Sequence, residues 1–175
     1  MDQLVAFDRQ SYFIFLGVLA LGRGMDILST WIATPRLLLE ANPLARRLGW
    51  KWGAVLNVTL CVLLAAWPMP AIVVATTSFL VASRNFQSAW LMRSMGEARY
   101  QCFIADQLSQ TPWALFLFCV LAQATLVALI GAALMVYSGW QLVPFGVGSG
   151  MITYGVAIAF YTLLAAWRRR SSGTI

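Results

Sequence analysis

The sequence contains no histidine and only one lysine, Lys51. Without an imidazole, the chain cannot ligate haem through histidine or form a Ser-His or Cys-His catalytic pair. A retinal-type Schiff base needs a buried lysine, whereas Lys51 stands between Trp50 and Trp52 at the expected start of an apolar segment. We therefore expect neither haem nor retinal as a cofactor.

Cysteines and charged residues are also scarce. Cys61, Cys102 and Cys119 lie far apart with no Cys-x-x-Cys pair, so we expect neither a disulfide framework nor a zinc site. Only 10% of residues are charged, 61% are hydrophobic, and the mean hydropathy is +0.76, which predicts a membrane protein. The first ten residues are acidic and lack a small-residue cleavage site, so no cleaved signal peptide is expected.

The apolar segments predict an all-α, polytopic membrane bundle that forms one domain over residues 1–175. At about 20 residues per crossing, the chain has room for about five transmembrane helices and no soluble domain. We place them at residues 11–33, 50–67, 71–92, 112–137 and 150–167. Residues 93–110 are polar with an apolar underside and are expected to lie flat on the membrane surface, with Glu97 on a solvated face.

Capping signals predict short interfacial helices between the first two spans. Thr34 precedes Pro35, and Asn42 precedes Pro43, which are N-cap and first-turn signals. We expect two short helical turns here, the second of which ends at Gly49.

Two groups of small residues carry separate predictions. In the first span, Gly17, Ala20 and Gly24 lie opposite the polar residues and are expected to allow close helix approach. The second group is expected to form a flexible turn on the outer side and consists of Gly146, Gly148 and Gly150.

The basic residues predict the orientation. They gather at the ends of apolar segments, where the positive-inside bias places them on the cytoplasmic side, so the net charge of +6 indicates a membrane surface and no nucleic acid partner. An N-out/C-in chain keeps Arg9 as the only basic residue outside and puts the others inside: Arg36, Arg46, Arg47, Lys51, Arg93, Arg99 and residues 168–170. We expect a multi-pass protein of the bacterial inner (cytoplasmic) membrane.

Eight polar residues are expected to converge at one depth on the cytoplasmic side. They come from the inner ends of the first three spans and from the connection after the first: Arg23, Asp26, Thr30, Glu40, Asn42, Asn57, Arg84 and Asn85. A charge at mid-membrane costs roughly 2.5 to 3.5 kcal/mol on insertion scales, so Arg23 and Asp26 need partners.

Several interpretations of this cluster are open. Asp26 could pair with Arg23 or with Arg84 and only hold helices together. The oxygen donors could instead bind a hard cation such as Mg²⁺, Ca²⁺ or Na⁺, with Asp26 and Glu40 as the candidate metal ligands. Alternatively, Arg23 and Arg84 could bind an anionic group with help from Asn85. For Asn42 and Glu40, helix capping is a competing explanation.

The run from Asp26, Ser29 and Thr30 to Glu40, Asn42 and Pro43 resembles the signature of a family of small bacterial and archaeal membrane proteins catalogued as a domain of unknown function. Members often have lysine where this chain has Asn57. The resemblance implies a multi-pass helical membrane protein and implies no activity.

We therefore predict a non-enzymatic accessory or binding subunit that contacts membrane lipids and other membrane proteins or copies of itself. The alternative is a small transporter or membrane enzyme that acts on a lipid or isoprenoid substrate with a cation held by Asp26 and Glu40.

Overall fold

The computed structural model describes residues 9–40 and 42–172, without the side chains of residues 169–172. The prediction about the first ten residues therefore lies almost wholly outside the described residues. The side chains of Arg169 and Arg170, which the orientation prediction includes, also lie outside them. The described residues form helices and no strand, which confirms the all-α class. The helices are α1 (Gln10–Ala33), α2 (Pro43–Leu64), α3 (Pro68–Met95), α4 (Glu97–Gln110), α5 (Trp113–Tyr137) and α6 (Leu142–Ser172).

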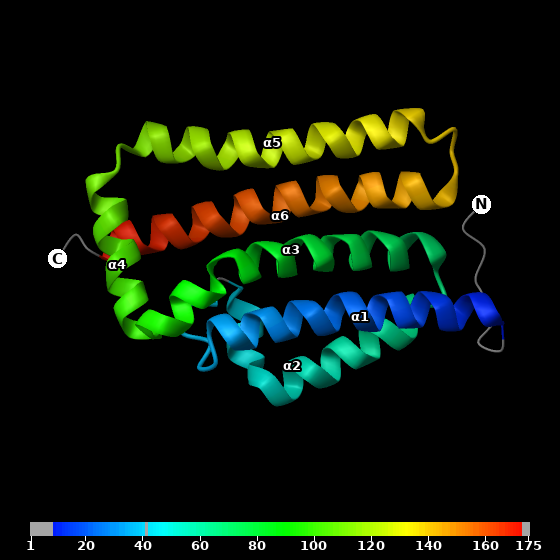
Figure 1. The fold of residues 1–175 in the computed structure, drawn as a ribbon, viewed down its shortest axis with the longest axis horizontal. Coiled ribbons are helices and arrows are strands. Elements are labelled where there is room, and N and C mark those ends of the chain that lie inside the picture. The colour runs from blue at the N-terminus through cyan, green and yellow to red at the C-terminus, as the bar shows by residue number, and fades with distance from the viewer. Residues whose placement is uncertain (1–8, 41, 173–175) are drawn as a thin grey trace.

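Four long helices run side by side in the order α1, α3, α6, α5 (Figure 1). Helix α2 packs mainly on α1 and tilts away from the row, and α4 crosses one end of the bundle. The α1–α2 loop, the end of α3 and the end of α6 lie at this α4 end. The turns that join α2 to α3 and α5 to α6 lie at the opposite end.

Three helices are long and apolar enough to cross a membrane: α1, α5 and α6 up to Arg168. This fits an integral membrane protein. Helices α2 and α3 fall short because they contain more polar residues. The first turns of α2 contain Arg46, Arg47 and Lys51, whereas α3 contains Arg84 and Arg93.

The α1–α2 connection corrects one capping prediction and confirms the other. Thr34 is the C-cap of α1, and the residues after it form a loop in which Leu37 has a φ of 56°, so no helical turn follows Pro35. Asn42 does cap α2, because its side chain accepts a hydrogen bond from the Leu44 N–H. Gly49 has a φ of 65° and interrupts α2, as expected for the end of a short helix.

The glycine predictions were wrong in both places. Helix α6 already begins at Leu142, so Gly146, Gly148 and Gly150 are helical. They let α6 approach its neighbours, since a Cβ at Gly150 would lie 2.7 Å from the Thr76 Cβ on α3. By contrast, a Cβ added at Gly17 or Gly24 would meet no atom within 4 Å. Helix α1 approaches α3 through Gly22 instead, which faces the Ala75 carbonyl.

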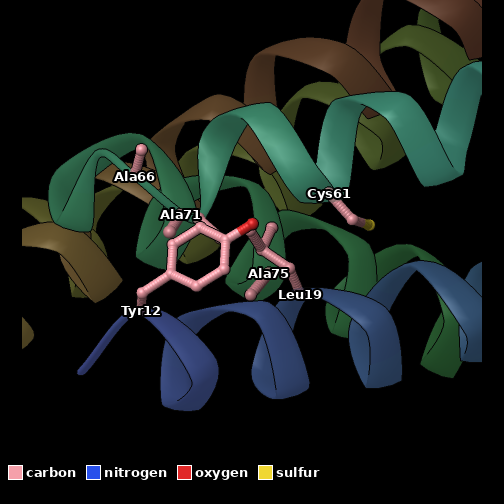
Figure 2. Packing of buried hydrophobic residues seen from close by; sticks show 7 residues of the cluster. Tyr12, Leu19, Cys61, Ala66, Ala71 and Ala75 are labelled. Atoms are coloured by element: carbon pink, nitrogen blue, oxygen red, sulfur yellow. The ribbon is translucent and has the colours of Figure 1, made fainter. Parts of the chain in front are cut away.

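A hydrophobic core fills the space between α1, α2 and α3 away from the α4 end (Figure 2). It is built mostly from small side chains around Tyr12 and Leu19, including Ala71 and Ala75 of α3. The Tyr12 hydroxyl donates to the Val62 carbonyl at 3.1 Å, which ties α1 to the end of α2. Towards the α4 end, this packing gives way to polar side chains.

Candidate binding site

A cavity of about 400 Å³ opens at the polar end of α1, α2 and α3 and is closed on one side by α6. Seven of the eight residues predicted to cluster line it: Arg23, Asp26, Thr30, Glu40, Asn42, Asn57 and Asn85. The volume lies within the usual range for small-molecule sites, roughly 300 to 1,000 Å³. Residues up to sixty-two positions apart, from Arg23 to Asn85, therefore meet at one place.

Arg23 connects three helices at the wall of this cavity. Its Nε donates to Asn57 Oδ1 of α2 at 2.6 Å, and its Nη1 donates to Asp26 Oδ2 at 2.9 Å and to Ser78 Oγ of α3 at 3.2 Å. Asn57 is itself held by a hydrogen bond from its Nδ2 to the Gly53 carbonyl. Two of the three guanidinium nitrogens thus bind protein partners, which weakens the prediction that Arg23 binds an anion.

Among the residues that the structure describes, two acids and one arginine line the cavity. Asp26 forms an ion pair with Arg23 through Oδ2 and keeps 17% of its side chain exposed. Glu40 Oε1 accepts a hydrogen bond from the Asn42 N–H at the start of α2, which supports the helix-start role considered for Glu40. The formal charges of Arg23, Asp26 and Glu40 sum to −1 in this part of the lining, which favours a cationic or neutral polar ligand over an anion.

Hydrogen bonds across the α1–α3 contact fix the position of Asp26. Asn85 Nδ2 donates to Ser29 Oγ and Thr30 Oγ1, each at 3.3 Å. The fully buried Ser29 hydroxyl donates in turn to the Asp26 carbonyl at 2.9 Å. These contacts lock the turn of α1 that bears the carboxylate, so a ligand would meet Asp26 in a prearranged geometry.

Arg84 is the predicted cluster residue that does not line the cavity. It points to α6, where its Nη2 donates to Thr162 Oγ1 at 3.2 Å. The buried Nη1 has no hydrogen-bond partner among the described residues. Asp26 pairs with Arg23, so the alternative pairing of Asp26 with Arg84 is wrong. The spacing along α3 explains this, because Arg84 and Asn85 lie about 100° apart and face different helices.

The loop from Thr34 to Glu40 closes the cavity at the α4 end and is held there by Glu97 of α4. The Glu97 carboxylate accepts hydrogen bonds from the Thr34 hydroxyl at 2.7 Å, the Arg36 N–H at 2.7 Å and the Leu38 N–H at 3.0 Å. Partial burial acts to raise the pKa of Glu97, but these hydrogen bonds and the charge of Arg36 outweigh it and lower the pKa. Glu97 is thus partly exposed, as a solvated face predicts, and it also anchors the loop, which the sequence did not predict.

Four residues of the site were not among the eight predicted to cluster. Trp50 and Tyr161 line the cavity and offer aromatic faces, and the Trp50 Nε1 donates to the Pro35 carbonyl at 2.8 Å. Ser29 and Ser78 are fully buried partners of the polar network. A signal for Ser78 was present, because the buried small residues of α3 recur at helical spacing: Ala71, Ala75, Ser78, Ala82 and Ala89.

The described residues contain no group of three or more acidic, cysteine or histidine side chains that could hold a metal ion. A cation in this cavity would therefore rely on Asp26 and Glu40 with neutral oxygens from residues such as Thr30 and Asn57. For an organic cation, the ring faces of Trp50 and Tyr161 would add cation–π attraction.

No family model, no curated protein and no solved structure matches the chain. The resemblance to the family of unknown function accordingly stays a prediction.

Proposed function

We propose that the chain is a five-span protein of the bacterial inner membrane that binds a small cationic ligand in its cytoplasm-side cavity. It acts as a non-enzymatic binding or accessory subunit. The observation that carries the proposal is the 400 Å³ cavity, whose lining pairs two carboxylates with one arginine that is already bound to protein atoms. The excess negative charge supports a cation, and the aromatic side chains support one with an organic part.

The proposed topology adds α2 and α3 to the three apolar helices, with the start of α1 outside and the end of α6 inside. Its support is the clustering of exposed arginines at the α4 end, among them Arg36, Arg93 and Arg99, as the positive-inside bias requires. A membrane-impermeant maleimide applied to intact cells would test it. Trp67→Cys at the α2–α3 turn should be labelled, and the native Cys102 on α4 should not. If Trp67→Cys is protected but a cysteine at Gln141 reacts, only three helices cross.

Ligand binding can be tested through stability, because a ligand that binds only the folded state at about 100 times its Kd adds about 2.7 kcal/mol. The purified protein would be heated with Na⁺, Mg²⁺, Ca²⁺ or tetramethylammonium. We expect at least one of them to raise the midpoint of unfolding, and Asp26→Asn and Glu40→Gln to abolish the increase. Asp106→Asn, which removes a carboxylate from α4 outside the cavity, is the matched control. An increase that survives in both cavity variants would refute the cation site.

The accessory role rests on exposed apolar surface. Large side chains such as Phe118, Val136 and Trp140 are 70 to 81% exposed, which a lipid bilayer or a partner subunit would cover. Purification in mild detergent followed by mass determination would show whether lipid alone or a partner subunit covers this surface. A complex with another membrane protein or a second copy is expected, and a lone monomer would contradict the accessory role.

The alternative is a small transporter or membrane enzyme that acts on a lipid or isoprenoid substrate. Its support is that Asp26 and Glu40 line the same cavity, since one or two carboxylates with substrate phosphates suffice for Mg²⁺. Mg²⁺ binding that requires an added isoprenoid diphosphate would favour this alternative over the binding subunit.

A further inference from the structure

A second recess lies at the α4 end and shares Ala33 and Met92 with the cavity. It has a volume of about 680 Å³ and is formed by the end of α1, the loop, the end of α3 and the start of α4. Three arginines from three different elements meet there: Arg36 of the loop, Arg93 of α3 and Arg99 of α4. All three are exposed.

The recess carries an excess of positive charge. Glu97 is the only acid among the described residues that line it, so three arginines against one glutamate leave a formal charge of +2. Within residues 9–40 and 42–172, no acid forms an ion pair with Arg36, Arg93 or Arg99. The Glu97 oxygens are already occupied by Thr34 and two backbone N–H groups. The guanidinium forks therefore remain available to an anion, and their geometry suits phosphate.

Apolar surface next to the recess points to a lipid as the source of that phosphate. The Arg93 guanidinium lies 5.9 Å from the ring centre of Trp31, whose side chain is 50% exposed. One and two helical turns before Trp31, the exposed residues Leu28 and Gly24 continue the same face of α1. Tryptophan beside arginine at the end of an apolar helix is typical of the headgroup level of a membrane.

We infer that this recess binds the phosphate of an anionic phospholipid of the cytoplasmic leaflet, with the acyl chains along the exposed face of α1. The headgroup phosphate contacts Arg36, Arg93 and Arg99. The parts of the acyl chains nearest the headgroup contact Trp31 and Leu28. The inference does not depend on what the polar cavity binds. It rests on the proposed function for the topology alone, which puts the α4 end at the cytoplasmic surface of the membrane.

The test compares lipid binding in three proteins of full length. Each would be reconstituted in nanodiscs of phosphatidylcholine and phosphatidylglycerol, and the lipids retained after gentle release would be counted by native mass spectrometry. The first is the wild type, and the second is R36Q/R93Q/R99Q. The third, R46Q/R47Q/K51Q, removes the same charge from α2, at the same end of the molecule but outside the recess.

We expect the wild type to prefer phosphatidylglycerol and R36Q/R93Q/R99Q to lose that preference by about fivefold or more for each arginine that contacts the phosphate. R46Q/R47Q/K51Q should keep most of the preference. Equal losses in both triple variants would overturn the inference, because general surface charge would then explain the binding. An unchanged preference in R36Q/R93Q/R99Q would also overturn it.

Two further measurements test whether misfolding explains the lost preference and whether the ligand is free phosphate. Arg99→Gln alone changes a residue on the exposed surface of α4 and should reduce the preference without loss of helix by circular dichroism. Inorganic phosphate added at millimolar concentration should leave the retained phosphatidylglycerol unchanged. If it displaces the lipid from wild type but not from R36Q/R93Q/R99Q, the recess is a site for free phosphate and the lipid inference is wrong.

Discussion

The α5–α6 contact and the α1–α3 contact hold pairs of long helices together by different means. Between α5 and α6 the backbones touch, because a Cβ at Gly131 would lie 2.5 Å from the Gly148 carbonyl oxygen and one at Gly155 would lie 2.8 Å from the Ala124 carbonyl oxygen. Between α1 and α3, small residues such as Gly22 and Ala75 also give close approach, and polar side chains take over towards the α4 end.

This difference separates a contact that only stabilises from one that also forms a site. Close backbone packing leaves no room for a ligand, and the α5–α6 contact has no ion pair among the described residues. The α1–α3 contact instead includes Arg23, Asp26 and Asn85, which the adjoining cavity exposes. The polar network of the α1–α3 contact therefore indicates a binding site because it borders a cavity, whereas the closely packed α5–α6 contact indicates only stabilisation.

The largest expected effect tests the α5–α6 contact. Gly131→Ala would place a methyl group against the Gly148 carbonyl and the Met151 Cβ, so the two backbones must separate. We expect a loss of about 3 kcal/mol in the free energy of unfolding, measured by SDS titration in mixed micelles. Gly17→Ala is the matched control, because a methyl group there meets nothing within 4 Å and alanine favours the helix. Equal effects of the two changes would show that the close approach does not limit stability.

The second prediction concerns the Arg23–Asp26 ion pair, which lies within α1 beside the α1–α3 contact. Removing one partner of a fully buried pair costs about 3 to 5 kcal/mol. Because 27% of the Arg23 side chain and 17% of the Asp26 side chain are exposed, we expect Arg23→Leu to cost about 2 kcal/mol. The double variant Arg23→Leu/Asp26→Leu should be more stable than Arg23→Leu alone, since no unpaired carboxylate remains. A double variant as unstable as the sum of the two single changes would argue against direct coupling.

A smaller effect is expected for Ser78→Ala. The buried Ser78 hydroxyl accepts a hydrogen bond from Arg23 Nη1, and its loss should cost about 1 kcal/mol in the same SDS titration. Ser94→Ala on the exposed surface at the end of α3 provides the control and should change stability by less than about 0.5 kcal/mol. No difference between the two serines would remove Ser78 from the network.

The smallest effect concerns the α1–α2 loop, residues 34–40, which Glu97 holds beside the cavity. Glu97→Gln should increase hydrogen exchange at the Arg36 and Leu38 amides severalfold, because a neutral side chain accepts weaker hydrogen bonds from them. Exchange in the α5–α6 turn, residues 138–141, should not change. Loop protection that is identical in Glu97→Gln and wild type would show that the carboxylate does not hold the loop.

The same contact predicts a pH dependence. Because the pKa of Glu97 is lowered in the folded protein, its contribution to stability is present above the ordinary glutamate value of about 4.3. It is lost as the pH falls through the still lower pKa of the folded state. Wild type and Glu97→Gln should therefore converge in loop protection at acidic pH.

The sequence predicted the helices well where hydrophobicity and length decide the outcome. Residues 11–33 and 112–137 differ from α1 and α5 by one residue at one end. Seven of the eight predicted cluster residues line one cavity because topology and helical depth bring them to the same level. The exception, Arg84, depended on rotation about the α3 axis, which follows from packing against α6.

Other features depended on contacts between distant residues. The position of Glu97 beside Thr34 is set by where α4 crosses the bundle, and no local pattern encodes it. The glycines of α6 were misinterpreted as a turn because their packing role appears only with α3 and α5 in place. Capping was predictable for Asn42, which acts on its own neighbours, and failed for Thr34, whose hydroxyl is occupied by Glu97.

Helices α2 and α3 are joined by a short turn and run in opposite directions, which has a consequence for the orientation of the rest of the chain. Such a hairpin adds two crossings or none, so the side on which α4 and the end of α6 emerge is the same in either case. The polar residues that keep α2 and α3 less apolar than α1, α5 and α6 therefore do not decide on which side of a membrane the rest of the protein lies.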